Sequence, residues 1–264
     1  MRAKLLILFY LAAFCPALFA QPADTLKLYE TGPVEVIHPR REQPIISLYP
    51  VRDAYVLSQG KKTEVLEINP VFINTVENNP RQVFNKIPGV MVWEMDGTGN
   101  QVSIATRGLN PHRSWELNVR QNGFILNSDV FGYPEAHYNP PIQAVQRIEM
   151  IRGAGALQYG QQFGGMLNYV LKEGGPGPVS VESETSVGSF GLFGSYTAIG
   201  GTKGKWKYYG YYNHRNSDGW RKNSDYTFDA WHVGATCSVN KKINIHAEVS
   251  RMAYINHFAA GLSD

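Results

Sequence analysis

The C-terminal third of the chain alternates between apolar and polar residues with a period of two. From Lys242 to Met252 the odd positions are mostly apolar and the even positions mostly polar, and Tyr226–Val239 repeats the pattern. Such alternation is typical of strands that have one apolar and one polar face. It predicts about five strands, at residues 179–188, 192–201, 204–214, 226–239 and 242–254.

Residues 61–175 have a different sequence pattern, with short apolar runs between turns rich in glycine, proline and asparagine. The expected strands are Thr63–Ile68, Met91–Trp93, Val102–Gly108 (alternating as a half-buried strand), Ile148–Ile151 and Met166–Leu171. Asn79–Lys86 opens like a helix because Pro80 stands at its first position. Asn122-Gly123 is a strong signal for a two-residue hairpin turn. The prediction for this region is a small α+β module.

Aromatic residues are concentrated in the third expected strand region. Lys203–Arg215 contains Trp206, Tyr208, Tyr209, Tyr211 and Tyr212. This density suits the aromatic girdle of a transmembrane β-barrel, although a soluble β-sandwich would also show alternation. Even small membrane barrels need about 8 strands and plugged transporters use about 22. In a membrane barrel, the five strands would be only an antiparallel β meander that begins it, in either a fragment or a truncated product.

The N-terminus has the features of a secretory signal peptide, which we expect to comprise residues 1–20. Arg2 and Lys4 precede an apolar stretch, Leu5–Phe14, and Ala20 stands at a plausible cleavage site. The apolar stretch is short for a membrane-spanning helix, which needs about 20 residues. The sequence therefore predicts export of the chain.

Charge and motif content exclude several classes of function. Residues 1–20 hold two basic and no acidic residues, so their removal lowers the formal net charge from +3 to +1. That balance argues against nucleic acid as a partner. Only Cys237 then remains, which excludes an internal disulfide framework. Because no HExxH, GxSxG or CxxC motif is present, we expect neither an enzyme nor a resident cofactor or metal.

The stretch 145–172, VQRIEMIRGAGALQYGQQFGGMLNYVLK, carries the most specific motif of the chain. A strand runs into Arg152-Gly153, a glycine-rich turn follows, and another strand closes the stretch. Ile87–Val90 (IPGV) and Thr106–Gly108 (TRG) precede it. In this order and spacing, these motifs resemble the plug domain of TonB-dependent outer-membrane receptors, which import scarce nutrients into Gram-negative bacteria.

The resemblance implies an order of domains and a location. Residues 21–60 would be a flexible arm, 61–175 the plug, and 176–264 the first strands of an incomplete transmembrane β-barrel. The chain would lie in the outer membrane of a Gram-negative bacterium after Sec export and signal-peptide cleavage, in contact with outer-membrane lipid. The arm would carry the TonB box, bound by the TonB energising complex of the inner membrane through strand addition. The candidate box residues are Pro33, Val34, Glu35, Val36 and Ile37, with Asp53–Leu57 as the alternative.

The same resemblance assigns a role to two arginines. Arg107 and Arg152 would face glutamates on the barrel wall, and Glu149 would belong to the same network. A buried guanidinium needs a paired carboxylate, and its planar fork binds one through two hydrogen bonds. We expect the wall partners to lie beyond Asp264. The alternative is that both arginines are exposed at the surface.

Two loops, residues 110–116 and 127–141, resemble the outward-facing apices of the plug. Their candidate ligand-binding residues are His112, Arg113, Trp115, Asp129, Tyr133, Glu135, His137 and Tyr138. We expect Arg113 and His112 to bind an anionic ferric chelate through charge-assisted hydrogen bonds, with tyrosines packed against its scaffold. For each residue, a solvated or barrel-packed loop is the alternative.

The region Trp93–Gly123 resembles the ferric-citrate-type siderophore receptors in particular, so the expected cargo is a ferric chelate such as a siderophore or ferric citrate. Haem, cobalamin or a carbohydrate remain as alternative cargoes. A secreted, non-transporting binding module is the alternative from a different class of protein.

Overall fold

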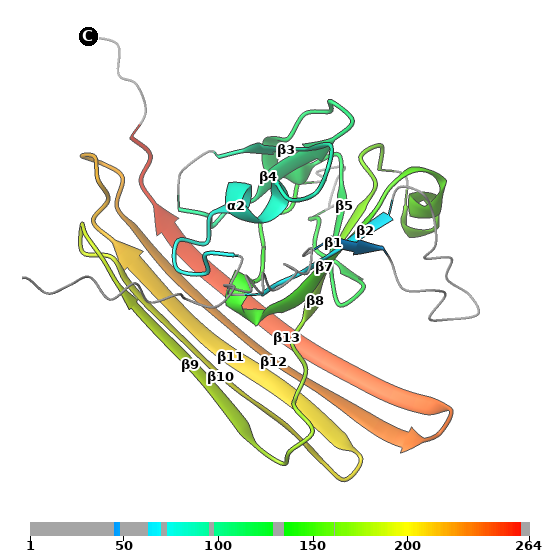
Figure 1. Ribbon diagram of the computed structural model, residues 1–264. Coiled ribbons are helices and arrows are strands. Elements are labelled where there is room, and N and C mark those ends of the chain that lie inside the picture. The colour runs from blue at the N-terminus through cyan, green and yellow to red at the C-terminus, as the bar shows by residue number, and fades with distance from the viewer. Residues whose placement is uncertain are drawn as a thin grey trace, which may run out of the picture. The chain divides into compact units, whose positions relative to one another are not determined.

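Five long antiparallel strands follow one another in the C-terminal part of this computed structural model, as Figure 1 shows in yellow-green to red. They are β9 (Ser180–Val187), β10 (Phe193–Lys203), β11 (Trp206–Ser217), β12 (Tyr226–Asn240) and β13 (Ile243–Asn256). Each pairs with the next in chain order, and we call this sheet the meander. The five strands predicted from the alternation are confirmed, with ends that differ by a few residues.

The structure describes residues 45–47, 63–69, 73–94, 98–128, 135–160 and 162–259. In these ranges, no helix is both long and apolar enough to cross a membrane.

The two faces of the meander differ in exposure and in chemistry. Tyr211, Arg215 and His232 are 4%, 3% and 2% exposed, whereas Trp206 and Val233 on the opposite face are 56% and 58% exposed. The large apolar residues exposed on that opposite face include Ile199, Ile245, Val249 and Ile255. The sheet thus buries polar and aromatic side chains on its inner face and presents aliphatic ones outward, the reverse of a water-soluble sheet.

The residues expected to form an aromatic girdle divide between these two faces. Trp206, Tyr208 and Tyr212 belong to the outward face by the alternation of side chains along β11. Tyr209 and Tyr211 are buried on the inner face. The girdle prediction is therefore wrong for Tyr209 and Tyr211, because a run of aromatic residues along a strand points alternately to both sides.

The two ends of the meander are closed by connections of different length. Residues 204–205 join β10 to β11, and residues 241–242 join β12 to β13. At the other end, residues 188–192 join β9 to β10 and residues 218–225 join β11 to β12. We call these the short-turn end and the long-loop end.

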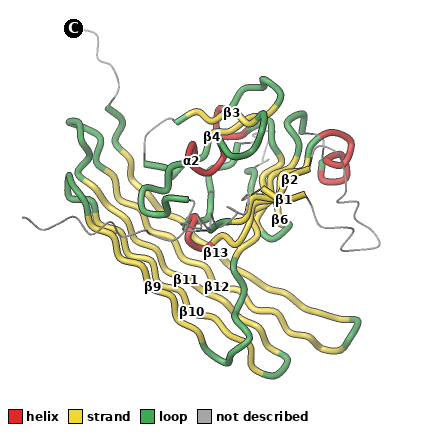
Figure 2. The backbone as a smooth tube through the Cα atoms, viewed as in Figure 1, coloured by secondary structure: helices red, strands yellow, loops and turns green. Residues whose placement is uncertain are grey.

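The residues that precede the meander form a smaller α+β unit, which we call the module (residues 45–47 and 63–172). Its main sheet has the order β1-β2-β7-β8-β5-β6, and β3 pairs with β4 separately. The strands are β1 (Ile45–Ser47), β2 (Thr63–Glu67), β3 (Val90–Trp93), β4 (Ser103–Thr106), β5 (Asn118–Gln121), β6 (Phe124–Ile125), β7 (Val145–Ile151) and β8 (Met166–Leu171). The helical segments are α2 (Pro80–Phe84), η1 (His112–Ser114), η3 (Ile142–Ala144) and η4 (Gly153–Tyr159), all short in Figure 2.

Local sequence signals explain two of these elements. The side chain of Asn79 caps α2 by accepting hydrogen bonds from the backbone of Arg81 and Gln82, which satisfies orphan donors of the first turn. Asn122 and Gly123 have φ angles of 49° and 88°, as a two-residue turn between twisted strands requires. The predicted helix start and hairpin are both confirmed.

Strand β4 is buried on both faces, so the prediction of a half-buried strand is wrong. Ser103 and Ile104 are both fully buried. The polar side chains bond to groups inside the module: the Ser103 hydroxyl accepts from the Arg113 backbone at 3.2 Å, and the Thr106 hydroxyl donates to the Gly164 carbonyl at 2.6 Å. Because both faces of this strand are buried, its alternation does not separate a buried face from a solvent-exposed one.

Two glycines with positive φ give a matched test of packing in the motif region. Gly153 has φ +70° with open space where a methyl group would stand, whereas at Gly165 (φ +104°) a methyl group would lie 2.5 Å from the Ile151 carbonyl oxygen. We expect Gly153→Ala to cost about 1–2 kcal/mol from backbone strain alone. Gly165→Ala should cost clearly more, measured as the loss of thermal stability. Equal losses would contradict the assigned close contact.

Candidate functional site

A cluster of basic side chains surrounds the carboxylate of Glu135. Arg113 Nη1 lies 2.8 Å from Glu135 Oε2, and the Nε2 atoms of His112 and His137 lie 3.5 and 3.6 Å from the same carboxylate. The Glu135 side chain is only 9% exposed, while the three basic side chains are 29–37% exposed. The structure thus joins the two loops predicted as apices at one carboxylate, which we call the Glu135 cluster.

The backbone around η1 holds this cluster in place. Arg113 and Ser114 adopt φ angles of 42° and 53°, a backbone conformation that residues with a Cβ atom seldom take. The Ser114 hydroxyl donates to the Val102 carbonyl and accepts from the Ile104 backbone, at 3.0 and 3.1 Å. The Ala136 backbone donates to the Arg113 carbonyl at 3.1 Å. These bonds fix η1 to β4 and to the segment that carries Glu135.

Two exposed indole rings belong to this region: Trp93 lies beside His112, and Trp115 directly follows η1 in the chain. Trp115 is 38% exposed and Trp93 is 48% exposed. The Trp93 ring centroid lies 6.3 Å from that of His112 in a tilted arrangement. The site therefore offers both basic groups and apolar surface. Asp129 and Tyr133, two further candidates, lie outside the described residues.

Tyr138 makes hydrogen bonds that the sequence did not predict. Its hydroxyl donates to Gln121 Oε1 at 3.0 Å and lies 3.3 Å from the hydroxyl of Tyr211 on β11. Burial raises the pKa of the Tyr138 hydroxyl, so it remains a donor across the physiological range. Tyr138 therefore contacts the meander, and packing of this residue against a ligand remains a prediction.

The two arginines singled out in the sequence lie in different environments. The Arg152 guanidinium forms an ion pair with Glu64 on β2 and donates to the Pro88 carbonyl at 2.9 Å. Its side chain is 13% exposed and that of Glu64 is 19% exposed. Arg107 is exposed, with Nη1 3.5 Å from the Phe163 carbonyl oxygen. Arg152 thus has a carboxylate partner within the module, and pairing of either arginine with a barrel wall remains a prediction.

Glu149 bonds to two neighbours on the strands of the module sheet. It accepts from Arg147 Nε at 2.8 Å and from Asn168 Nδ2 at 3.0 Å. Glu64, the partner of Arg152, lies opposite Met150 in the pairing of β2 with β7, and Met150 points to the other face of the sheet from Glu149. That Glu149 shares a network with Arg152 remains a prediction.

The meander contacts the module near its long-loop end through Arg215, which is 3% exposed. Its guanidinium donates to the Thr98 carbonyl at 3.2 Å and to the Glu77 carbonyl at 3.1 Å. Close by, Asn100 Nδ2 donates to Asn256 Oδ1 at 2.9 Å. The segment just before β4 is therefore attached to the long-loop end of the meander. In the chain, β4 leads on to η1.

A second set of contacts is built on glutamates of the meander. Glu184 Oε1 on β9 accepts from Thr75 and from Gln143, each at 3.2 Å. Glu248 on β13 accepts from Gln121 Nε2 at 3.0 Å and from Asn122 Nδ2 at 2.6 Å. Amides and a hydroxyl of the module thus donate hydrogen bonds to glutamates of the meander.

Sequence reasoning missed Arg215, Glu184 and Glu248. The usable signal was alternation, which is clearest in β13: Glu248 shares its face with Asn244, His246 and Ser250, opposite Ile243, Ile245 and Val249. A polar side chain at such a position must face either water or a partner.

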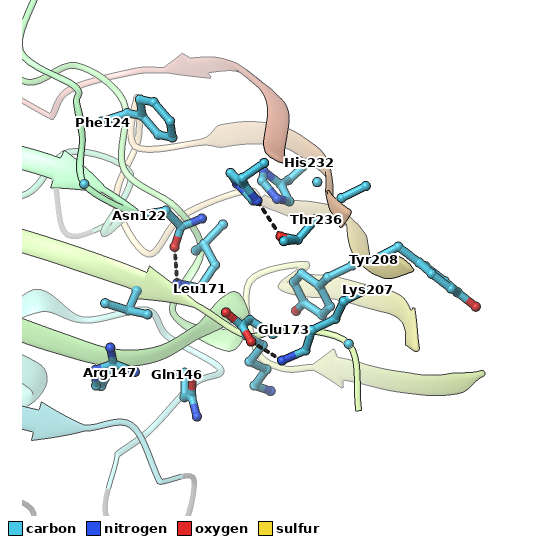
Figure 3. Close-up of a pocket in the computed structure, with 18 of the residues that line it drawn as sticks. Asn122, Phe124, Gln146, Arg147, Leu171, Glu173, Lys207, Tyr208, His232 and Thr236 are labelled. Carbon is cyan, nitrogen blue, oxygen red and sulfur yellow. Dashed lines mark hydrogen bonds and ion pairs between the residues drawn. The ribbon is translucent and has the colours of Figure 1, made fainter. Parts of the chain in front are cut away.

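A cavity of about 680 Å³ lies beside the Glu248 contact. Asn122 and Phe124 line it from the module, and Lys207 and His232 line it from the meander (Figure 3). Lys207 also pairs with Glu173, as the dashed line in Figure 3 marks. In the described part of the chain, no group of three or more His, Cys, Asp or Glu side chains is arranged to hold a metal ion.

Residues 71–166 match the family model described as the TonB-dependent Receptor Plug Domain. The module is a TonB-dependent receptor plug. The plug match covers the IPGV and TRG motifs, the Glu135 cluster and most of the 145–172 stretch.

Known proteins similar to this chain agree with the plug assignment. The vitamin B12 transporter BtuB of Vibrio vulnificus (strain CMCP6) is 30% identical over 110 residues, which are 41% of this chain and 16% of that protein. The unliganded ferric citrate transporter FecA has a TM-score of 0.62 at 23% identity, covering 76% of this chain and 32% of that one. The copper transporter OprC has a TM-score of 0.60 at 16% identity, covering 78% and 32%.

These structural likenesses show the fold, a plug followed by an antiparallel strand meander. The chain spans about a third of the length of FecA and OprC and a sixth of the length of BtuB. The prediction of an α+β plug followed by the first strands of a barrel is confirmed at this level.

The ion pair between Arg152 and Glu64 can be tested by removing one charge. Glu64→Gln keeps the shape of the side chain but loses the carboxylate, so we expect a loss of roughly 1–3 kcal/mol of plug stability. Glu77→Gln, at an exposed position of the plug, should change stability by less than about 0.5 kcal/mol. Thermal unfolding of both variants checks the difference, and an equal effect at both positions would contradict a structural role for the pair.

Proposed function

We propose that this chain is the N-terminal part of a TonB-dependent receptor that takes up an anionic ferric chelate, such as a ferric siderophore or ferric citrate. The observation that carries this proposal is the convergence of Arg113, His112 and His137 on one carboxylate position. An arginine binds carboxylate groups through two parallel hydrogen bonds. Together these groups suit a ligand that presents several anionic oxygens.

The position of the cluster supports a role in capturing the ligand. Gln101 donates to the Tyr254 hydroxyl of β13 at 2.5 Å, and β4 and η1 follow directly in the chain. The cluster is therefore attached to the part of the plug that contacts the long-loop end. In membrane barrels of this type the longer loops are extracellular and the short turns are periplasmic. Trp93 and Trp115 would pack against the apolar parts of the chelate.

The chemistry of the meander supports insertion in the outer membrane. Its outward face is aliphatic and aromatic, while its polar groups bond to the plug. In lipid, backbone polar groups must be satisfied by a closed barrel or by helices. We therefore place the chain in the outer membrane of a Gram-negative bacterium, in contact with lipid, after export and cleavage of the signal peptide.

Transport requires an energy source that the outer membrane lacks. We propose that the TonB complex of the inner membrane supplies it by binding a short β-forming segment of the N-terminal arm. The candidate segments, residues 33–37 and 53–57, lie outside the described residues. No step of this proposal uses a catalytic group, a resident cofactor or nucleic acid.

Cobalamin is the second candidate cargo, because BtuB is 30% identical over 110 residues. Cobalamin uptake would make little use of three converging basic side chains. The two candidates therefore differ in their dependence on Arg113.

The test is binding of ferric citrate and of cobalamin to the full-length receptor, with and without Arg113→Gln. The substitution removes a charge-assisted hydrogen bond, worth about 1.5–3 kcal/mol, so we expect the dissociation constant for the ferric chelate to rise roughly tenfold or more. Added salt should also weaken binding. Growth of the host on the chelate under iron limitation should fall in parallel.

Arg81→Gln is the matched control, because Arg81 forms a plug-surface ion pair with Glu94 and its side chain is 52% exposed. It should leave binding within about twofold, since exposed pairs contribute little. Tight cobalamin binding that Arg113→Gln leaves unchanged, with no binding of ferric chelates, would overturn the proposed cargo class.

A further inference from the structure

The tip of the β5–β6 hairpin carries two neutral amides to one carboxylate of the barrel wall. Gln121 Nε2 and Asn122 Nδ2 donate to the two oxygens of Glu248 at 3.0 and 2.6 Å. The side chain of Glu248 is 10% exposed, and Gln121 is 2% exposed. The contact is largely shielded from water, which strengthens its hydrogen bonds.

Neighbouring residues on the meander orient Glu248. His246 Nε2 lies 3.0 Å from Glu248 Oε2, and the Thr236 hydroxyl lies 2.8 Å from His246 Nδ1. Gln121 Nε2 also donates to the Ser250 hydroxyl at 3.1 Å. The carboxylate is thus held in position by its own strand and by β12, so that plug and wall meet at a prepared acceptor.

The tip of the β5–β6 hairpin makes contacts toward the Glu135 cluster and toward the cavity. On one side, Tyr138 donates to Gln121 Oε1 at 3.0 Å, and Tyr138 is three residues from Glu135. On the other side, Asn122 and His246 line the cavity of about 680 Å³. The Gln121–Asn122 pair therefore connects the segment that carries the Glu135 cluster to the cavity.

The cavity itself is polar and charged on both walls. Lys207 pairs with Glu173, and Arg147 pairs with Glu149 at 2.8 Å. Its volume lies within the range of about 300–1,000 Å³ that small-molecule sites occupy. Such walls suit a hydrated, charged solute better than an apolar one.

We propose that Glu248, Gln121 and Asn122 form a latch that holds the plug against the wall, and that the adjoining cavity is the chamber entered by the cargo when the latch opens. This inference rests on the proposed function for the identity of the cargo. The latch joins a carboxylate to neutral amides, so water entering from the cavity can replace each bond. The Arg152–Glu64 ion pair lies within the plug and moves with it, so it does not oppose this opening.

Asn122→Asp tests the latch with almost no change in shape. Asn122 Oδ1 accepts from the Leu171 backbone at 2.9 Å, and an aspartate keeps that acceptor and tolerates the turn. The other oxygen would face Glu248, so a donor is replaced by like-charge repulsion. We expect the open probability of the full-length receptor in planar bilayers to rise roughly tenfold, the equivalent of one lost charged hydrogen bond.

Glu248→Gln in the same chain provides the rescue, because the new amide can donate to the carboxylate introduced by Asn122→Asp. The double variant should return the open probability to within about threefold of the wild type, as coupled neighbours in a mutant cycle do. Binding of ferric citrate should be unchanged in both variants, because Arg113 and its histidine neighbours are untouched.

Asn168→Asp is the matched control within the plug. Asn168 donates to Glu149 at 3.0 Å and accepts from the Gly123 backbone at 2.9 Å, so the chemistry is the same but both partners belong to the plug. This variant should leave the open probability within about twofold, since both partners move together, and should destabilise the plug unless Glu149→Gln is added.

The proposal is overturned if Asn122→Asp leaves the open probability unchanged, or if Glu149→Gln rescues that variant as well as Glu248→Gln does. The bilayer readout needs no ligand. A receptor that fails to bind ferric citrate would therefore contradict the proposed cargo. The latch would still be tested by the open probability of the variants.

Discussion

The inner face of the meander imposes the constraint on which the rest of the structure depends. Its strands bury Arg215, His232 and Glu248 where a soluble sheet would bury aliphatic side chains, and buried polar groups must be hydrogen-bonded. The plug bonds to Arg215 with the carbonyls of irregular loops and to Glu248 with amide side chains, while His232 contacts Ser250 of the meander. A domain rich in turns offers such groups at many angles, which a regular sheet does not. The plug therefore completes the polar face of the strands around it.

Much of the fold follows from local patterns in the sequence. Period-two alternation located the strands of the meander, Pro80 located α2, and Asn122-Gly123 located the β5–β6 hairpin. These signals act within a few residues and depend on backbone geometry. Strand β4 departs from the exposure that its alternation predicts, because its serine and threonine bond to partners inside the plug. Alternation distinguishes the two faces of a strand but does not say what covers each face.

The site was predictable only in part, because its contacts join residues far apart in the chain. The family motif and loop context pointed to Arg113, Glu135 and the two histidines, but not to their convergence on one carboxylate. The partner of Arg152 was missed since Glu64 follows from the pairing of β2 with β7, which sequence patterning does not specify. The same limit applies to Tyr138, whose burial against Tyr211 depends on where the plug meets β11.

In the proposed ligand site, the carboxylate of Glu135 has a consequence for selectivity. It is an internal anion tethered beside Arg113, and a tethered group competes at an effective concentration on the order of millimolar or more. A small monovalent acid at micromolar levels competes poorly with it. A chelate that presents several oxygens at once would gain from each additional contact, so in the proposed site the protein's own side chain would select incoming anions by valence.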